Sequence, residues 1–306
     1  MNIILTGAAG HLGTDVSQQL IERGHAVIGT DVKPARNPKH EVIVGSLTEP
    51  FFFHRVLDNM PDADAIIHLA NIPHPYSAEP QRILRENLSI NTNVFMPALD
   101  RNIPRVIYAS SIQAWSQSQD HASNHPVDHA HIDRLPIDES HPTNPNNTYG
   151  LSKRLAEHML DSLCTKHFRE PPLTAASLRF PAIVPDDFFL RAAPRRIAEP
   201  KPELPSQLSE GLSYIARSDA AYLCVAAAET PTPNHQIFWA VTPEPRSFHH
   251  STSDLIDHYI PNIPGADRAK QLNSLFDSSK AQQTFNWTPK RLFADFIKTH
   301  QAEASA

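Results

Sequence analysis

A glycine-spaced turn near the N-terminus limits what this chain can fold into more than any other feature. The apolar run 3–5 leads directly into the sequence GAAGHLG at residues 7–13, and apolar residues then recur at helical spacing over 11–23. A buried strand, a tight turn and a helix in this order are typical of a parallel sheet that holds a dinucleotide at the turn. The residues expected to contact the dinucleotide here are Gly7, Ala9, Gly10, His11, Leu12 and Gly13.

The glycines have separate physical roles in such a turn. Gly7 lets the chain turn sharply where the strand ends, and Gly10 lets the backbone approach a pyrophosphate that any Cβ would obstruct. Gly13 lets the helix pack tightly on the sheet. The N-terminus of the helix then offers free N–H groups and a positive dipole end to the phosphates.

An acidic residue ends the second predicted strand. Asp31 follows the apolar run 26–30, at the position where a carboxylate accepts hydrogen bonds from the adenosine ribose hydroxyls. A carboxylate there repels the additional phosphate of NADP, so the sequence predicts NAD as the cofactor and disfavours NADP. Lys33 and Arg36 are close enough in sequence to weaken this preference.

A tyrosine and a lysine form the second informative motif. Tyr149 and Lys153 lie four residues apart within a predicted helix, 148–168, and therefore share one face. A tyrosine has an unperturbed pKa of about 10, and a nearby ammonium lowers it by favouring the phenolate. Ser111, at the end of a predicted strand, would hold a substrate oxygen beside the phenol. These residues predict nicotinamide-dependent redox chemistry at an alcohol or carbonyl carbon.

Strands and helices alternate over the first 180 residues. This order predicts an α/β protein with a Rossmann-type, doubly wound parallel sheet. The regularity fades after Arg179, where proline becomes frequent. We therefore expect an NAD-binding Rossmann domain over 1–180 and a small C-terminal substrate lobe over 181–306, interleaved with the last strands. The predicted strands are 2–6, 26–30, 41–44, 65–69, 106–110, 174–178 and 236–241, and the helices are 11–23, 50–59, 81–101, 148–168, 218–229 and two short ones near the C-terminus.

Composition excludes several classes of function. The 306 residues carry a net charge of -6 without a basic stripe, which gives no reason to expect nucleic acid. No apolar run approaches the ~18–20 residues that span a membrane, and a strand from residue 2 leaves no room for a signal peptide. Cys164 and Cys224 are too few for a disulfide framework, so a reducing, cytoplasmic compartment is expected.

A histidine-rich segment separates the serine strand from the tyrosine helix. Residues 117–136 contain His121, His125, His129 and His131, a density that can indicate a metal site. The segment lacks cysteine and is otherwise polar, so we interpret it as a solvated loop and predict no metal. Its place between two catalytic elements would allow it to cover the substrate.

On these motifs the chain resembles the extended short-chain dehydrogenase/reductases, the family of NAD-dependent epimerases and dehydratases. The resemblance implies that Ser111, Tyr149 and Lys153 form the catalytic triad, the last two also touching the cofactor. It further implies a homodimer through the helices 81–101 and 148–168, with Leu155, Met159 and Leu163 helping to fill the interface. The matching segments are 6–13, Asp31, 67–70, 87–91, 106–111, 138–142, 149–153, 178–180 and 218–221. Further implied cofactor contacts are Leu69, Ala70, Asn71, Asn91 and the backbone after Arg179, and the expected substrate contacts are Ser111, Ile112, Gln113 and Arg179.

Departures from the family pattern narrow the expected reaction. Sugar-nucleotide dehydratases carry an Asp-Glu pair after the catalytic hydroxyl residue, whereas this chain has Ile112 and Gln113, which cannot exchange protons. Ala182 stands where sugar-nucleotide enzymes usually carry an asparagine that contacts the substrate diphosphate, and the segment 179–219 is short for covering a nucleotide. The first departure makes a dehydratase of that type unexpected. The other two favour a small, non-nucleotide substrate, and together the departures place the chain closer to uronate-dehydrogenase-like members than to UDP-sugar epimerases.

Three functions stay open at this point. The first is an NAD-dependent oxidoreductase that moves hydride between the cofactor and a small-molecule substrate. The second is an epimerase of a sugar or related metabolite, which oxidises and re-reduces its substrate on a cofactor that it keeps. The third is a non-catalytic dinucleotide-sensing module, and the intact Ser111, Tyr149 and Lys153 argue against it.

Overall fold

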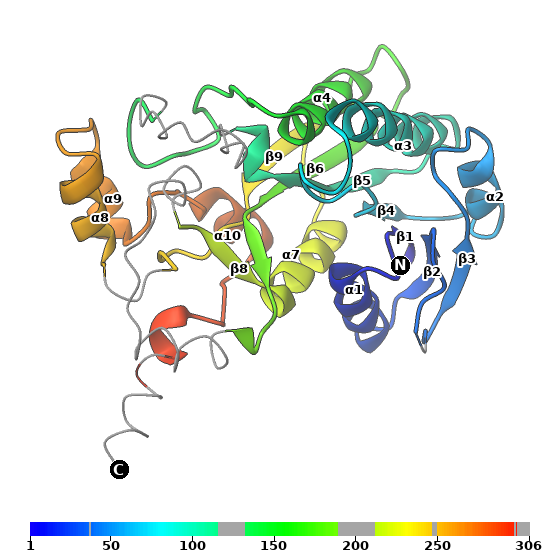
Figure 1. Cartoon of the computed structure of the whole chain (residues 1–306). Helices are drawn as coiled ribbons and strands as arrows, with labels where there is room; N and C mark the ends of the chain where they lie inside the picture. Colours follow the sequence, from blue (N-terminus) through cyan, green and yellow to red (C-terminus); the bar gives the residue numbers. More distant parts are fainter. Residues whose placement is uncertain (37, 116–131, 189–211, 247–249, 297, 299–306) are drawn as a thin grey trace.

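The computed structural model describes residues 1–36, 38–115, 132–188, 212–246, 250–296 and 298. A seven-stranded parallel sheet forms its centre, with strand order β3-β2-β1-β4-β5-β6-β9 (Figure 1). The chain thus starts in the middle of the sheet and builds outward in both directions, which confirms the predicted doubly wound fold. The strands are β1 (Asn2–Thr6), β2 (Ala26–Asp31), β3 (Glu41–Val44), β4 (Ala65–His68), β5 (Arg105–Ser111), β6 (Thr174–Phe180) and β9 (His235–Trp239).

Helices cover both faces of this sheet (Figure 1). The first strand shows why, because Ile3 and Leu5 point into one apolar core and Ile4 points into the other, and all three are fully buried. A central parallel strand needs apolar side chains on both faces for this reason. One face packs against α1 (His11–Glu22), α7 (Arg217–Glu229) and α10 (Ser279–Phe285), and the other against α2 (Phe52–Asp58), α3 (Pro80–Asp100) and α4 (Thr148–Leu163).

The second half of the chain adds elements that the sequence did not predict. The strands β7 (Ala182–Val184) and β8 (Tyr214–Ala216) pair in parallel as a separate small sheet. The short helices α8 (Thr252–Tyr259) and α9 (Ala266–Leu272) precede α10, and residues 293–296 are helical as well, so the described residues hold more short C-terminal helices than the two expected. Because α7 and β9 return to the main sheet, the chain after residue 181 is interleaved with it, while the division at residue 180 stays a prediction.

The helix that carries the tyrosine motif is shorter than predicted. It ends at Leu163, not at Phe168. The Thr165 hydroxyl donates to the carbonyl of Ser162 at 2.9 Å. The Phe168 side chain is exposed, so a further helical turn would gain no stability from burying it.

A buried ion pair joins this helix to two strands of the sheet. The Glu157 carboxylate of α4 is fully buried and accepts two hydrogen bonds of 2.8 Å from the Arg179 guanidinium of β6. The Ser110 hydroxyl of β5 donates to the same carboxylate at 2.8 Å, and Arg154 donates at 3.1 Å. Burial raises the pKa of Glu157, but the charge and hydrogen bonds of Arg179, with smaller effects of Ser110 and Arg154, outweigh it, so the pKa lies below its ordinary value.

Removing one partner of this pair should destabilise the fold. Glu157→Gln leaves the Arg179 guanidinium buried without a counter-charge, and we expect the free energy of unfolding to fall by about 3–5 kcal/mol. Urea unfolding at neutral pH measures the loss. The matched control is the double substitution Glu157→Leu with Arg179→Leu, which removes both charges and should cost less than Glu157→Gln alone. An unchanged unfolding midpoint for Glu157→Gln would contradict the interpretation.

Candidate active site

The glycine turn has the geometry that the sequence predicts. Gly7 adopts a φ of +73°, and a Cβ there would lie 3.0 Å from the backbone nitrogen of Ala70, at the end of β4. A Cβ on Gly13 would lie 2.1 Å from the carbonyl oxygen of Gly7. Glycine is therefore required at both positions, one for the turn and the other for the close approach of α1.

The start of α1 is suited to an anion. Its N-cap is Gly10, no side chain caps the helix, and no acidic residue occupies its first turn, so the first N–H groups are left for a phosphate. His11 is exposed at the first position, while Leu12 packs against the core. The Asp31 carboxylate lies beside the turn, since it accepts a hydrogen bond from the backbone nitrogen of Ala9 at 3.0 Å. The residues present therefore fit a dinucleotide.

A glycine also brings the tyrosine helix against the serine strand. A Cβ on Gly150 would lie 2.2 Å from the carbonyl oxygen of Gln113, in the short 3-10 helix η1 (Ile112–Ala114) that follows β5. Only glycine permits α4 to begin this close to the residues after Ser111. The Asn147 side chain caps α4 by accepting from the backbone nitrogen of Gly150 at 2.8 Å. Tyr149 therefore enters the helix next to the turn that Ser111 begins.

The predicted substrate contacts differ in their surroundings. The Ser111 hydroxyl accepts from the backbone nitrogen of Gln113 at 3.1 Å, and the Gln113 side chain accepts from Asn147 at 3.3 Å. Ile112 is buried in an apolar cluster with Trp115 and Trp239. Arg179 is 1% exposed, its charge is compensated by Glu157, and within the described ranges its Nη1 has no hydrogen-bond partner. Any contact of Arg179 with a substrate would therefore rest on that one nitrogen.

Lys153 is held between α4 and β5. Its side chain is buried, and Nζ donates hydrogen bonds to the carbonyl oxygen of Ala109 at 2.7 Å and to Oδ1 of Asn71 at 3.0 Å. The same nitrogen lies 5.6 Å from the centre of the Tyr149 ring. Burial lowers the pKa of Lys153 to about 7, against an opposing effect of Glu157. The amino group thus lies beside the phenol, as the sequence motif predicts.

The end of β4 supplies a buried polar network that includes the expected cofactor contacts Asn71 and Asn91. The Oδ1 of Asn91 accepts from Asn71 Nδ2 at 2.9 Å and lies 3.0 Å from Nε2 of His68, and the expected contact of Asn91 with the cofactor stays a prediction. His68 is fully buried, and burial lowers its pKa to about 3, so the ring is neutral. A histidine inside an otherwise apolar strand is the sequence feature that indicates a polar group buried at this point.

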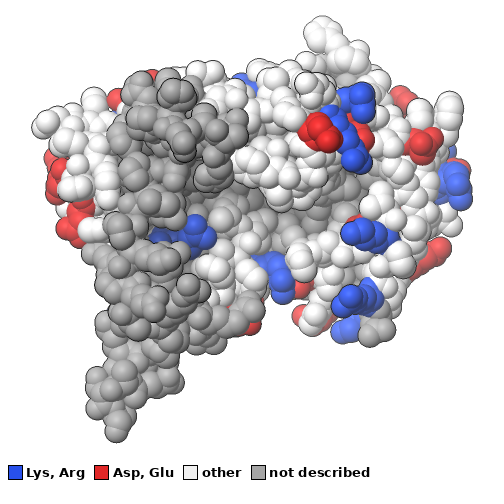
Figure 2. Space-filling view, viewed as in Figure 1, with Lys and Arg blue, Asp and Glu red and all other residues white. Residues whose placement is uncertain are grey.

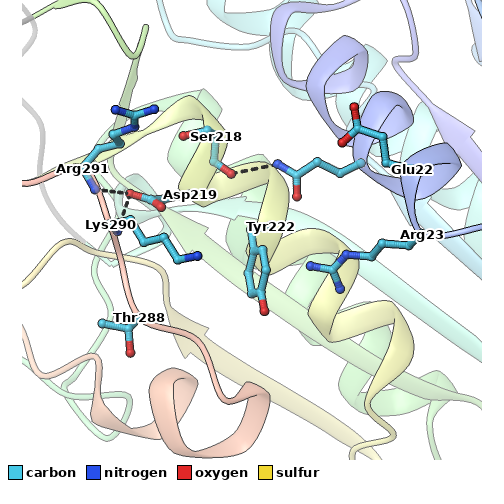
Figure 3. A pocket seen from close by; sticks show the side chains of 9 residues that line it. Glu22, Arg23, Ser218, Asp219, Tyr222, Thr288, Lys290 and Arg291 are labelled. Carbon is cyan, nitrogen blue, oxygen red and sulfur yellow. Dashed lines mark hydrogen bonds between the residues drawn. The ribbon is translucent and has the colours of Figure 1, made fainter.

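A surface hollow of about 380 Å³ lies away from the catalytic residues (Figure 3). It opens between α1, α7 and the segment 288–291, where the Arg23 guanidinium lies 4.4 Å from the centre of the Tyr222 ring. The Asp219 carboxylate accepts from the backbone nitrogens of Lys290 and Arg291 at 3.0 and 2.9 Å. These hydrogen bonds fix the chain after α10 to α7, and we interpret the hollow as the surface of this structural contact. Its lining residues are Gln19, Glu22, Arg23, Ser218, Asp219, Tyr222, Thr288, Lys290 and Arg291.

Three further features of the described residues concern basic patches, possible metal sites and membrane-spanning helices. Figure 2 shows Lys and Arg scattered over this face and not gathered in one basic patch. Across the described ranges, no three His, Cys, Asp or Glu side chains form a possible metal site, and no helix is long and apolar enough to cross a membrane. His121, His125, His129 and His131 lie outside the described residues.

Comparison with known proteins supports the resemblance to the NAD-dependent epimerases and dehydratases. The chain matches the profile of the NAD dependent epimerase/dehydratase family over residues 3–234. It is similar to a UDP-glucose 4-epimerase of Lactobacillus helveticus, 24% identical over 52% of this chain and 46% of that protein. It is also similar to a uronate dehydrogenase of Pseudomonas syringae pv. tomato, 26% identical over 78% of this chain and 74% of that protein. Among solved structures, MoeE5 in complex with UDP-glucuronic acid and NAD has a TM-score of 0.68 and 17% identity, covering 99% of this chain and 100% of that chain.

The share of each relative that aligns with this chain differs between the matches. The chain spans about half the length of the UDP-glucose 4-epimerases that it matches, 46–49%. The alignment with the uronate dehydrogenase extends over most of both chains. At 17% identity, the likeness to MoeE5 establishes the fold alone.

Proposed function

The chain belongs to the NAD dependent epimerase/dehydratase family and is an enzyme of that family, and we propose that it transfers hydride between NAD and a hydroxyl or carbonyl carbon of a small, non-nucleotide substrate. The observation that carries the proposal is the placement of Lys153, whose amino group lies 5.6 Å from the Tyr149 ring centre at the end of β5. Its contact with the carbonyl oxygen of Ala109 holds it in that position.

The three catalytic residues divide the work between them. When NAD is bound, its nicotinamide ring supplies the acceptor or donor of the hydride. The Tyr149 hydroxyl takes up or returns the proton of the substrate oxygen. A protonated Lys153 beside the ring favours the phenolate, which makes that exchange easier near neutral pH. Ser111, at the end of β5, holds the substrate oxygen next to the phenol.

Two alternatives differ in what happens to the cofactor. A dehydrogenase releases NADH, whereas an epimerase re-reduces its own intermediate and keeps NAD. The extended similarity to a uronate dehydrogenase favours the first. The similarity to UDP-glucose 4-epimerases keeps the second under consideration. Sugar acids are therefore the first substrates to screen, with NADH absorbance separating the two reactions.

We also propose a homodimer through α3 and α4. These helices pack against each other on one face of the sheet, and both present apolar side chains to solvent, since Met96 and Leu151 are each 37% exposed. Leu155 and Met159 are half-buried and available to an interface. Leu163 is 5% exposed and packs in the chain's own core, so its predicted place in the interface is corrected. Light scattering at micromolar concentration measures the mass.

Removing the phenol hydroxyl should stop the chemistry and spare cofactor binding. Tyr149→Phe keeps the ring, so we expect turnover to fall by about 10²–10⁴-fold while NAD binds as before. Ser111→Ala should lower turnover in the same way, whereas Lys153→Met should weaken both turnover and NAD affinity. The control is Tyr222→Phe, outside the catalytic site, which should leave both unchanged. Wild-type turnover in Tyr149→Phe would show that another group carries the proton.

The cofactor preference should follow from Asp31. Its carboxylate lies against the glycine turn, where it can accept from two ribose hydroxyls and repel a phosphate. We expect NAD to bind more tightly than NADP in calorimetric titrations, and Asp31→Asn to reduce the difference. Equal or tighter binding of NADP to the wild-type protein would refute the role of Asp31 and shift attention to Lys33 and Arg36.

A further inference from the structure

The Asn71 side chain is oriented by every group around it. Its Oδ1 accepts from Lys153 Nζ at 3.0 Å and from the Tyr108 hydroxyl at 3.2 Å. Its Nδ2 donates to Oδ1 of Asn91 at 2.9 Å and to the carbonyl oxygen of Ala70. An ammonium can only donate, so turning the amide over would put two donors against each other. The amide oxygen must therefore face Lys153.

A second layer of side chains fixes this orientation. Asn91 Oδ1 can only accept, so the neutral His68 ring must carry its proton on Nε2, 3.0 Å away. Nδ1 of His68 is then an acceptor for the Thr6 hydroxyl at 2.7 Å. That hydroxyl in turn accepts from the backbone nitrogen of Ala70 at 3.2 Å. One arrangement of protons satisfies every hydrogen bond in the series from Thr6 of β1 to Lys153, which makes the Asn71 oxygen a preorganised acceptor.

The acceptors of Lys153 are both uncharged. Of its three N–H groups, one points to the Ala109 carbonyl and one to Asn71, which leaves one for the cofactor or for Tyr149. No carboxylate binds this nitrogen directly among the described residues, and Glu157, the acid whose charge acts on it, is bound to Arg179. The other titratable groups around Lys153 are the rings of Tyr149 and Tyr108, at 5.6 and 4.8 Å, and His68.

We propose that Asn71 is a positioning residue for Lys153, whose uncharged side-chain oxygen fixes the amino group beside Tyr149 without supplying a negative charge. A carboxylate at the same place would fix the group equally well but would hold its proton. An amide leaves Lys153 able to change protonation within the working pH range. The inference rests on the proposed function only in that Lys153 serves the reaction through Tyr149.

The test is the titration of Lys153 in the protein without NAD. Lysine labelled with ¹³C at Cε reports protonation by NMR, and the Lys153→Met variant assigns the resonance. Asn71→Asp places a carboxylate against the ammonium and should raise the pKa of Lys153 by roughly 1–3 units. Asn71→Ala removes a hydrogen bond to the charged form and should lower that pKa. The control, Asn59→Asp on the exposed end of α2, adds the same charge far away and should leave it unchanged.

The outcomes separate this inference from the proposed function. Shifts of opposite sign in Asn71→Asp and Asn71→Ala support it, and unchanged titration in both variants overturns it whatever the activity. If Asn71→Asp does not fold, the sign of the shift in Asn71→Ala decides alone. In the enzyme with NAD, the alkaline limb of the pH profile of kcat/KM should move upward in Asn71→Asp with the Lys153 titration. A titration that moves while this profile stays fixed would uphold Asn71 and refute the role of Lys153.

Discussion

The arrangement of the site depends on a buried carboxylate. Glu157 binds Arg179 of β6 and Ser110 of β5, and so fixes α4 to both strands. Glu157 lies one helical turn from Lys153, and Ser110 directly precedes Ser111. A buried pair of this kind adds little net stability, but a misplaced helix would leave a charge buried and unpaired. The pair therefore selects one register of α4 on the sheet, and with it the position of Tyr149.

The same helix begins at a point of contact that only glycine allows. Gly150 lies against the carbonyl oxygen of Gln113, and Asn147 caps the helix immediately before it. Glu157 thus fixes the middle of α4, while Gly150 fixes its start. Between these two points, the hydrogen-bond acceptors of Lys153 among the described residues are neutral oxygens, so its charge stays responsive to what binds beside it. In this way the packing that stabilises the fold also sets the electrostatics of the site.

Much of this fold could be predicted from the sequence, because the features that determine it are local. The apolar run before Gly7 predicts a strand, and the spacing of Tyr149 and Lys153 predicts a helix face. The strands β7 and β8 could not be predicted, because strands of three residues are too short to show a period. Asn71 and Lys153 are 82 positions apart in the sequence, and no sequence pattern that contains one of them predicts a contact with the other. Arg179 shows the same limit, since only the fold reveals that Glu157 takes its charge.

The most direct measurement of the central claim is a crystal structure of the complex with NAD. We expect the pyrophosphate at the start of α1, the adenosine ribose on Asp31, and the nicotinamide ribose on Lys153, with Nζ still bound to the carbonyl oxygen of Ala109. A nicotinamide ring bound away from Tyr149 and Lys153 would contradict the assignment of these residues to hydride-transfer chemistry.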